Sequence, residues 1–249
     1  MSDLVTAVPT IRDSVAAILR LHVVESGKGG KGKSKAPQIQ AALVGSAFCI
    51  VEDKYLLTAY HIFNGGKQRD PGDRFYAFTV PGNGLKAYHF PVISFPVEKP
   101  ERDVAVLEIG PCAIADQHIP SLPISFSPQP DGSRVVTVGF PAPEISKLSV
   151  DPQLNYKGGQ FFLKSHANEG IVSSQYMAGD VLIYELSVGW HHGESGGPIA
   201  ALTDPPAAFS LMQHYRNVQS PHGTVAGPHR GHALSVIRDE LISLGVELV

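Results

Sequence analysis

The sequence predicts an all-β protein, and two observations support this. It contains 25 glycines and 20 prolines in 249 residues, which suits many short strands joined by turns better than a bundle of helices. Apolar runs of strand length alternate with clusters of turn-forming residues along most of the chain. The chain is also long enough to bury a substantial core without disulfides or metal ions.

The first half of the chain is expected to form one set of strands. Residues 11–24 fit either a short amphipathic helix or an opening strand, and periodicity does not decide between them. The basic, glycine-rich residues 27–35 are interpreted as a solvated hairpin loop, with a docking segment for an anionic partner as the alternative. Strands are predicted at 41–52, 55–61, 75–80, 87–95 and 103–109.

A change of composition separates this half from the next. Residues 110–130 contain five prolines, which is typical of a connection between two units. Residues 235–245 repeat apolar side chains at helical spacing and end in glycine, so they predict a closing helix. The strands predicted between these two segments lie near 134–140, 160–167, 170–176, 180–188, 197–203, 208–215 and 230–236.

The most informative stretch is residues 189–198, Gly-Trp-His-His-Gly-Glu-Ser-Gly-Gly-Pro. A turn of this composition would hold the hydroxyl of Ser195 on a rigid corner, because glycine adopts unusual backbone angles at little cost. It would also direct the backbone N–H groups of Gly193 and Ser195 at one point beside that hydroxyl. Acyl transfer needs this combination of nucleophile and fixed donors. The alternative is an ordinary glycine-rich turn between two strands.

Two further residues would complete such a site. His61 ends the apolar run 56–61, and Asp103 opens the apolar run 103–109. Taken singly, they could be a core histidine and a turn aspartate. Along the chain, however, the histidine comes first, the aspartate second and the serine third. This is the order of the catalytic residues in chymotrypsin-like serine peptidases, and it differs from the order in subtilisins and α/β-hydrolases.

The chain therefore resembles the trypsin-like serine peptidases. Residues 45–48 (Gly-Ser-Ala-Phe) resemble the Gly-Ser-Gly-Phe strand of that family, and residues 138–141 and 170–173 resemble segments of its bacterial, HtrA-like branch. The resemblance extends from about residue 12 to about residue 245. HtrA relatives usually carry a PDZ-type module after the peptidase domain, and this sequence shows no sign of one.

The resemblance implies a fold of two six-stranded antiparallel β-barrels of chymotrypsin type with a C-terminal α-helix. Residues 1–249 would form one peptidase unit. Within it, about 11–119 would be the N-terminal barrel, about 120–234 the C-terminal barrel and 235–245 the helix.

The resemblance also implies a serine endopeptidase that cleaves peptide bonds through an acyl-enzyme, without cofactor or metal. Ser195 would be the nucleophile and His61 the base that becomes the acid for the leaving amine. Asp103 would hold the histidine in the correct tautomer. The N–H groups of Gly193 and Ser195 would form the oxyanion hole.

The substrate pocket is expected to lack a charge at its floor. Trypsin-like selection of lysine or arginine requires an acid six positions before the serine, where this chain has Gly189. Gln213, His214, Tyr215 and His232 are expected to contribute the walls. We expect a shallow apolar pocket for a small or medium side chain, or a histidine, His214 or His232, that donates to a glutamine or an acidic side chain.

Glu194 differs from the aspartate usual in the trypsin branch. There, that acid pairs with a new N-terminus after zymogen cleavage. This chain has no recognisable Ile-Val-Gly-Gly start. Activation by that cleavage is therefore not expected.

The lack of a recognisable signal peptide and the cysteine content favour a cytoplasmic protein. The formal net charge of −3 gives no reason to expect nucleic acid or an anionic membrane as the main partner. The sequence shows no signal peptide and no apolar stretch long enough to span a membrane. The two cysteines, Cys49 and Cys112, favour a reducing compartment, and a disulfide between them is allowed but not required.

The histidines give little support for a metal site. The chain has 11 of them, but the adjacent His191 and His192 would point to opposite faces of a strand. His222, His229 and His232 fall in a glycine- and proline-rich stretch, expected to be a loop, without a known ligand pattern.

Two other functions remain open. One is a catalytically silent relative that binds peptides or proteins in the same cleft. The other is a peptidase that a regulatory protein partner activates.

Overall fold

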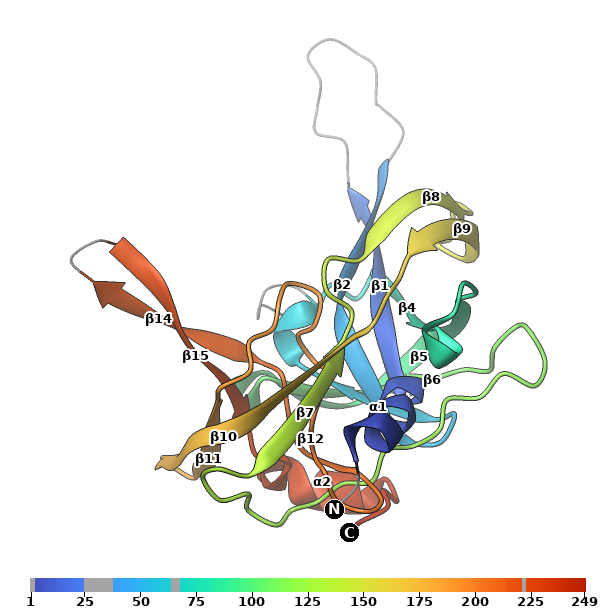
Figure 1. The fold of residues 1–249 in the computed structure, drawn as a ribbon. Helices are drawn as coiled ribbons and strands as arrows, with labels where there is room; N and C mark the ends of the chain where they lie inside the picture. Colours follow the sequence, from blue (N-terminus) through green and yellow to red (C-terminus); the bar gives the residue numbers. More distant parts are fainter. Residues whose placement is uncertain (1–2, 25–37, 64–67, 221–222) are drawn as a thin grey trace.

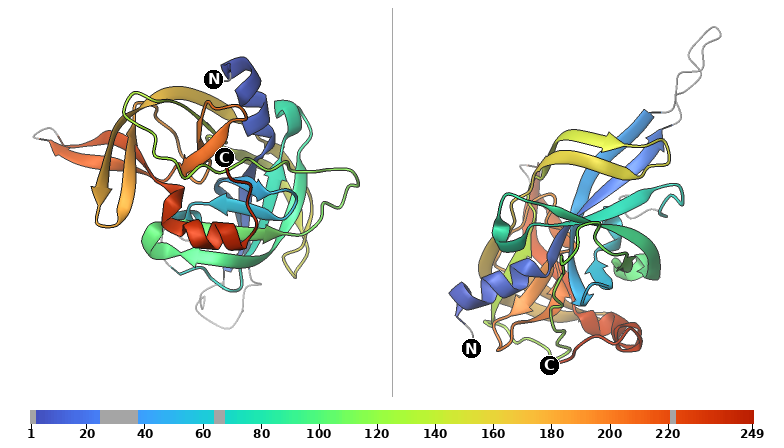
Figure 2. Two further views of the ribbon diagram at one scale, coloured as in Figure 1. Left: turned by 90° about the horizontal axis from the view of Figure 1, so that it is seen from below. Right: turned by 90° about the vertical axis from the view of Figure 1, so that its right-hand side faces the viewer.

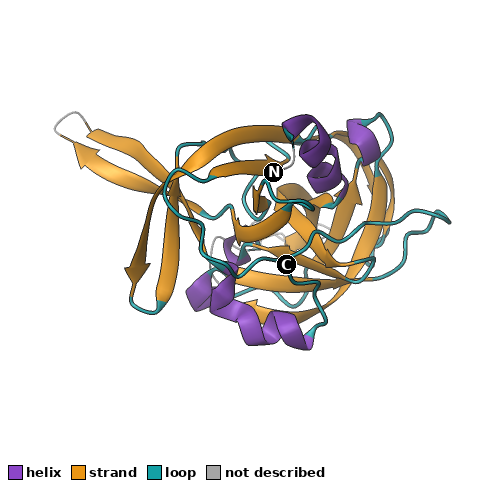
Figure 3. Ribbon diagram, turned by 60° about the horizontal axis from the view of Figure 1, so that its bottom comes forward, coloured by secondary structure: helices purple, strands orange, loops and turns teal. Residues whose placement is uncertain are grey.

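The computed structural model describes residues 3–24, 38–63, 68–220 and 223–249. Residues 215–220 and 224–226 are described by their backbone alone. The basic residues 27–35 and His222 lie outside the described residues, so the interpretations placed on them are not tested. Strands dominate the structure, which confirms the predicted all-β class (Figure 3).

The N-terminal segment resolves the choice between helix and strand by containing both. Helix α1 spans Leu4–Asp13 and strand β1 follows at Val15–Val24. Between them, Ser14 donates both its N–H and its hydroxyl to the carbonyl oxygen of Ile11, which ends the helix. Ala7 and Ile11 are the buried residues of the helix, so the helix packs on the core through these two positions.

The first six strands form a closed antiparallel barrel in the order β1-β2-β3-β6-β5-β4 (Figure 1). Large apolar side chains fill it, among them Phe48, Leu57, Phe78 and Phe90, all almost wholly buried. The remaining strands of the barrel are β2 (Gln38–Val51), β3 (Tyr55–Thr58), β4 (Arg74–Thr79), β5 (Tyr88–Lys99) and β6 (Val104–Ile109).

The second half forms a curled seven-stranded sheet in the order β13-β12-β7-β10-β11-β15-β14, in place of the expected six-stranded barrel (Figure 2). Tyr184, Trp190, Phe209 and Met212 belong to its apolar core. Its strands are β7 (Arg134–Gly139), β10 (His166–Ala178), β11 (Val181–Leu186), β12 (Pro198–Ala201), β13 (Ala207–Leu211), β14 (His214–Ser220) and β15 (Gly223–His232).

Two parts of this half differ from the sequence prediction. Strand β8 (Glu144–Val150) was not expected; it pairs with β9 (Tyr156–Phe162) as a separate two-stranded sheet. The stretch expected to be a loop around His229 belongs to strand β15, which pairs with both β11 and β14 and ends at His232, inside the strand predicted near 230–236. Its ladder to β14 shifts register between Tyr215 and Asn217. Such an irregularity lets a strand carry a residue like Pro228 that lacks an N–H.

The chain closes with a 3₁₀ turn at Leu234–Ile237 and helix α2 at Arg238–Ser243, which together cover most of the predicted closing helix. No helix in the described part of the chain is long and apolar enough to cross a membrane. Cys49 and Cys112 are both free thiols. Burial raises the pKa of Cys49 to about 12, so this thiol stays protonated and unreactive at neutral pH.

Candidate active site

His61 is presented to solvent by a short turn whose neighbours are anchored in the core. Strand β3 ends at Thr58, and a 3₁₀ turn follows at Tyr60–Ile62. Tyr60 and Ile62 are buried, whereas the His61 side chain is 28% exposed. The two flanking side chains therefore fix the turn while the imidazole between them faces outwards.

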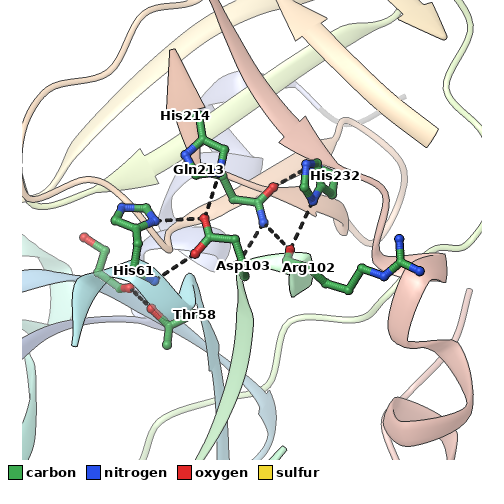
Figure 4. A network of polar contacts seen from close by, with 8 residues as sticks. Thr58, His61, Arg102, Asp103, Gln213, His214 and His232 are labelled. Carbon is green, nitrogen blue, oxygen red and sulfur yellow. Dashed lines mark hydrogen bonds and ion pairs between the residues drawn. The ribbon is translucent and has the colours of Figure 1, made fainter. Parts of the chain in front are cut away.

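Asp103 meets His61 from the turn before β6. It follows the 3₁₀ turn Pro100–Arg102 and has φ of +53°, an uncommon conformation for a residue other than glycine. Its Oδ1 accepts the backbone N–H of His61 at 2.7 Å, and its Oδ2 lies 2.8 Å from His61 Nδ1 (Figure 4). A carboxylate at Nδ1 favours the tautomer with the proton on Nδ1, which leaves Nε2 as an acceptor.

Ser195 lies in the tight loop between β11 and β12. The loop is held by the N–H of Gly196, which donates to Met212 O at 2.7 Å, and by Ser195 O, which accepts the N–H of Ser46 at 2.8 Å. Ser195 and His61 line one cleft of about 700 Å³, with Pro141, Ala142, Trp190, His191, His192, Gln213 and His214. No hydrogen bond joins Ser195 to His61 in the portion of the chain that is described.

The peptide between His192 and Gly193 has a defined orientation. Its carbonyl oxygen accepts the N–H of Ala142 at 2.8 Å, so in a trans peptide the N–H of Gly193 points the opposite way. The carbonyl of Gly193 accepts the hydroxyl of Ser46 at 2.7 Å. Within the described residues, neither Gly193 nor Ser195 donates its backbone N–H to another protein group, so both donors are free beside the Ser195 side chain.

Three glycines of this loop allow no larger residue. Gly193 has φ of +96° and Gly196 has φ of +87°. A Cβ at Gly193 would lie 2.3 Å from Phe140 O, one at Gly196 2.2 Å from Ser46 O, and one at Gly197 2.3 Å from Val138 O. The backbone therefore packs too closely on β2 and β7 for side chains at these positions.

Glu194 stabilises the loop from inside. It is fully buried, its Oε2 accepts the N–H of His191 at 2.5 Å, and Asn168 Nδ2 donates to its Oε1 at 3.4 Å. Burial raises the pKa of this carboxyl group. Among the residues described, no lysine, arginine or histidine forms an ion pair with Glu194, so hydrogen bonds hold the turn. The expected absence of cleavage-dependent activation stays a prediction.

The expected pocket residues are only partly brought together. Gln213 and His214 line the cleft, whereas His232 lies behind it, with its N–H donated to Gln213 Oε1 at 2.7 Å. The side chain of Tyr215 lies outside what the structure describes. At Gly189 a Cβ would lie 3.2 Å from His229 Nε2.

Sequence reasoning did not predict that His229 lies beside Gly189 and Trp190. Its ring packs against Trp190 at 4.4 Å between centroids, and burial lowers the pKa of its imidazole. Its Nε2 lies beside Gly189, 3.2 Å from the place that a Cβ at that glycine would take. Ser46 was quoted only as part of a strand motif, and its role at Gly193 was missed as well.

Three clusters of histidine and carboxylate groups in the described part of the chain have the spacing of metal ligands. In each cluster, a carboxylate already has a hydrogen-bond partner: Asp103 contacts His61, Asp73 contacts both Arg20 and His22, and Asp53 accepts the N–H of Ile119 and contacts His118. None of these contacts requires a metal ion, and the expected absence of a metal stays a prediction. The clusters are His61–Asp103–His214, His22–Asp70–Asp73 and Glu52–Asp53–His118.

A closed antiparallel barrel carries the His–Asp pair, and a curled second sheet carries the glycine-rich serine loop. This arrangement defines the fold of chymotrypsin-type peptidases. The model of the trypsin-like peptidase domain family matches residues 45–204, which is more than half of the chain and includes His61, Asp103 and Ser195. The chain therefore belongs to the trypsin-like peptidase family.

Solved structures show the same fold. An HtrA-type protease, AlgW, with a decapeptide superimposes with a TM-score of 0.61 at 15% identity, over 97% of this chain and 67% of that chain. A serine-to-alanine variant of AlgW with a decapeptide gives a TM-score of 0.64 at 15% identity, over 98% and 68% of the two chains. At this identity the likeness concerns the fold alone. No curated protein matches the sequence.

Proposed function

We propose that this protein is a serine endopeptidase that acts through an acyl-enzyme. The observation that carries the proposal is that Ser195 and His61 line one cleft while Asp103 Oδ2 is hydrogen-bonded to Nδ1 of His61. The free N–H groups of Gly193 and Ser195 add the electrostatic element that acyl transfer requires.

In the first half-reaction, Ser195 Oγ would attack the carbonyl carbon of the scissile peptide while its proton passes to His61 Nε2. The N–H groups of Gly193 and Ser195 would stabilise the oxyanion, and Asp103 would stabilise the imidazolium. Collapse breaks the C–N bond, and His61 protonates the leaving amine. Water then attacks the acyl-enzyme by the reverse proton transfers, which releases the acid and restores Ser195.

The cleft supports a preference for a small or medium apolar side chain before the cleaved bond. Trp190, Pro141 and Ala142 give the cleft apolar walls. The side chain beside Gly189 is that of His229, which is not an acid and would not attract a basic side chain of the substrate. The solved neighbours are HtrA-type proteases with bound peptides, which is consistent with peptide substrates for this chain.

A peptide library tests the reaction and the preference together. Wild type should cleave internal bonds after small or medium apolar residues, and Ser195→Ala should lose activity by about 10⁶-fold. Ser146→Ala, which changes an exposed serine on the separate β8–β9 sheet, is the matched control and should cleave as wild type does. Equal cleavage by wild type and Ser195→Ala would refute the proposal. Cleavage only after a protein partner is added would favour the partner-activated alternative.

A further inference from the structure

The carboxylate of Asp103 lies between two imidazole rings. His214 opens strand β14, and its Nε2 lies 3.2 Å from Asp103 Oδ2, the same oxygen that lies 2.8 Å from His61 Nδ1 (Figure 4). One atom from each of these three side chains lies within 4.8 Å of the other two. Two imidazole nitrogens and one carboxylate oxygen are a donor set that suits Zn²⁺, which often takes three protein ligands and one exchangeable one.

The spacing of the three atoms fits a single ion. In a tetrahedral zinc site with bonds of about 2.0–2.1 Å, neighbouring ligand atoms lie about 3.4 Å apart. The contacts at Asp103 Oδ2 measure 2.8 and 3.2 Å, so each ring needs to move away from the carboxylate by only about 0.6 Å or less. Asp103 Oδ1 accepts the backbone N–H of His61 at 2.7 Å, which leaves Oδ2 as the oxygen available to the ion.

The three side chains stand on connected backbone and can be reached from solvent. Gln213, next to His214, donates from Nε2 to the carbonyl oxygens of Arg102 and Asp103 at 3.0 and 2.9 Å. His61 and His214 line the cleft, with side chains 28% and 49% exposed. An ion could therefore enter from the cleft and find its ligands already close together, which reduces the entropy that binding would cost.

The other two clusters with metal-ligand spacing in the described part of the chain are poorer sites. Each of them contains a single imidazole. In one, Asp73 Oδ2 already accepts the guanidinium of Arg20 at 2.6 Å, and that positive charge would repel a cation. In the other, the imidazole is that of His118, which is 63% exposed and therefore less fixed. The pair of imidazoles distinguishes the cluster at Asp103.

We propose that Zn²⁺ binds to His61 Nδ1, His214 Nε2 and Asp103 Oδ2 and thereby inhibits the peptidase reversibly. The inference rests on the proposed function and concerns the regulation of the same site. The ion takes no part in the reaction, which still proceeds without a metal. The fourth ligand, a water molecule or a group of a bound peptide, would come from the cleft.

Inhibition follows from the protonation of the His61 ring. A neutral imidazole carries one proton and binds a metal through its other nitrogen. With the ion on Nδ1, the ring proton is on Nε2, so Nε2 cannot accept the proton of Ser195. The ion would also offset the negative charge of Asp103, which otherwise stabilises the imidazolium. No covalent bond of the protein forms or breaks, so a chelator should restore activity.

The test measures rates of fluorophosphonate labelling at about pH 7.5 over about 0.1 μM to about 1 mM free zinc. Each variant is compared with itself without zinc, so its basal rate does not enter. Wild type should lose labelling as zinc rises and regain it with excess EDTA. His214→Ala lacks one ligand and should need at least about tenfold more zinc for the same inhibition. His118→Ala removes the imidazole of another cluster and should be inhibited as wild type is.

The outcomes separate this inference from the proposed function. Wild type that labels equally at every zinc concentration would overturn the inference. A His214→Ala variant that is as sensitive to zinc as wild type would also overturn it, because the ion would then act elsewhere on a chain with 11 histidines.

If wild type does not label even without zinc, the proposed function fails, and binding of Co²⁺ decides the inference without any activity. Co²⁺ takes the same ligands, and in a tetrahedral site it absorbs visible light. Wild type and His118→Ala should show this band, whereas His61→Ala and His214→Ala should show it weakly or not at all. Equal bands in all four proteins would overturn the inference.

Discussion

Replacing Ser46 by alanine tests whether the glycine-rich loop is held by the barrel. The Ser46 hydroxyl donates to Gly193 O at 2.7 Å and accepts the N–H of Phe140 at 3.0 Å, and the side chain is fully buried. Alanine would leave one buried acceptor and one buried donor without partners. Each such group costs about 1–3 kcal/mol. Because Gly193 is only partly buried and water can reach it, we expect a total loss of about 2–3 kcal/mol.

Two assays follow from this estimate. In thermal melting, Ser46→Ala should unfold about 4–12 °C below wild type, whereas Ser146→Ala, an exposed serine that also donates to a backbone carbonyl, should differ by at most about 0.5 kcal/mol. In fluorophosphonate labelling, a loosened Gly193 peptide should slow Ser46→Ala by about tenfold to a hundredfold, less than the complete loss of an oxyanion donor. A Ser46→Ala variant that melts and labels like wild type would refute this reasoning.

Three further predictions concern the same loop and its acid. Gly196→Ala should prevent folding or strongly destabilise the protein, because its Cβ would lie 2.2 Å from Ser46 O; Gly132→Ala has the same φ of +87° but open space around it, so its melting temperature should fall much less, and equal effects would contradict the packing argument. Burial raises the pKa of Glu194 above its ordinary value of 4.5, so the native state binds this proton more tightly than the unfolded state and wild type loses stability as pH rises through the raised pKa. Urea unfolding of Glu194→Gln should lack that loss, and parallel pH profiles of the two proteins would count against it. Asp103→Asn should keep the fold but react about 10⁴-fold more slowly with a peptide substrate; a rate near that of wild type would rule out the assigned role of Asp103.

The sequence was sufficient to predict His61, Asp103 and Ser195 as candidate site residues, because each stands beside a short, recognisable local pattern; their catalytic roles stay a prediction. It also located most strands. It missed β8 and most of β14, and it missed the first part of β15 because Gly227 and Pro228 are typical of loops. The structure accommodates them where the ladder between β14 and β15 shifts register, a non-local event that local composition does not reveal.

The contacts that arrange the site could not be predicted for a related reason. Ser46 reaches Gly193 across 147 positions of sequence, and His214 reaches Asp103 from the other sheet. His229 meets Gly189 only because β15 returns beside β11. Such pairs depend on how the two sheets pack, and neither partner carries a local signal. The expected division of the chain near residue 120 and the cytoplasmic location stay predictions.

Mapping the fluorophosphonate adduct tests whether Ser195 is a nucleophile that His61 activates. Wild type, Ser195→Ala and His61→Ala would be labelled in parallel from about pH 6 to about pH 9, digested and analysed by mass spectrometry. We expect one adduct, on the peptide containing Ser195 in wild type, and none in either variant. An adduct on another residue, or no adduct in wild type at any of these pH values, would contradict this expectation.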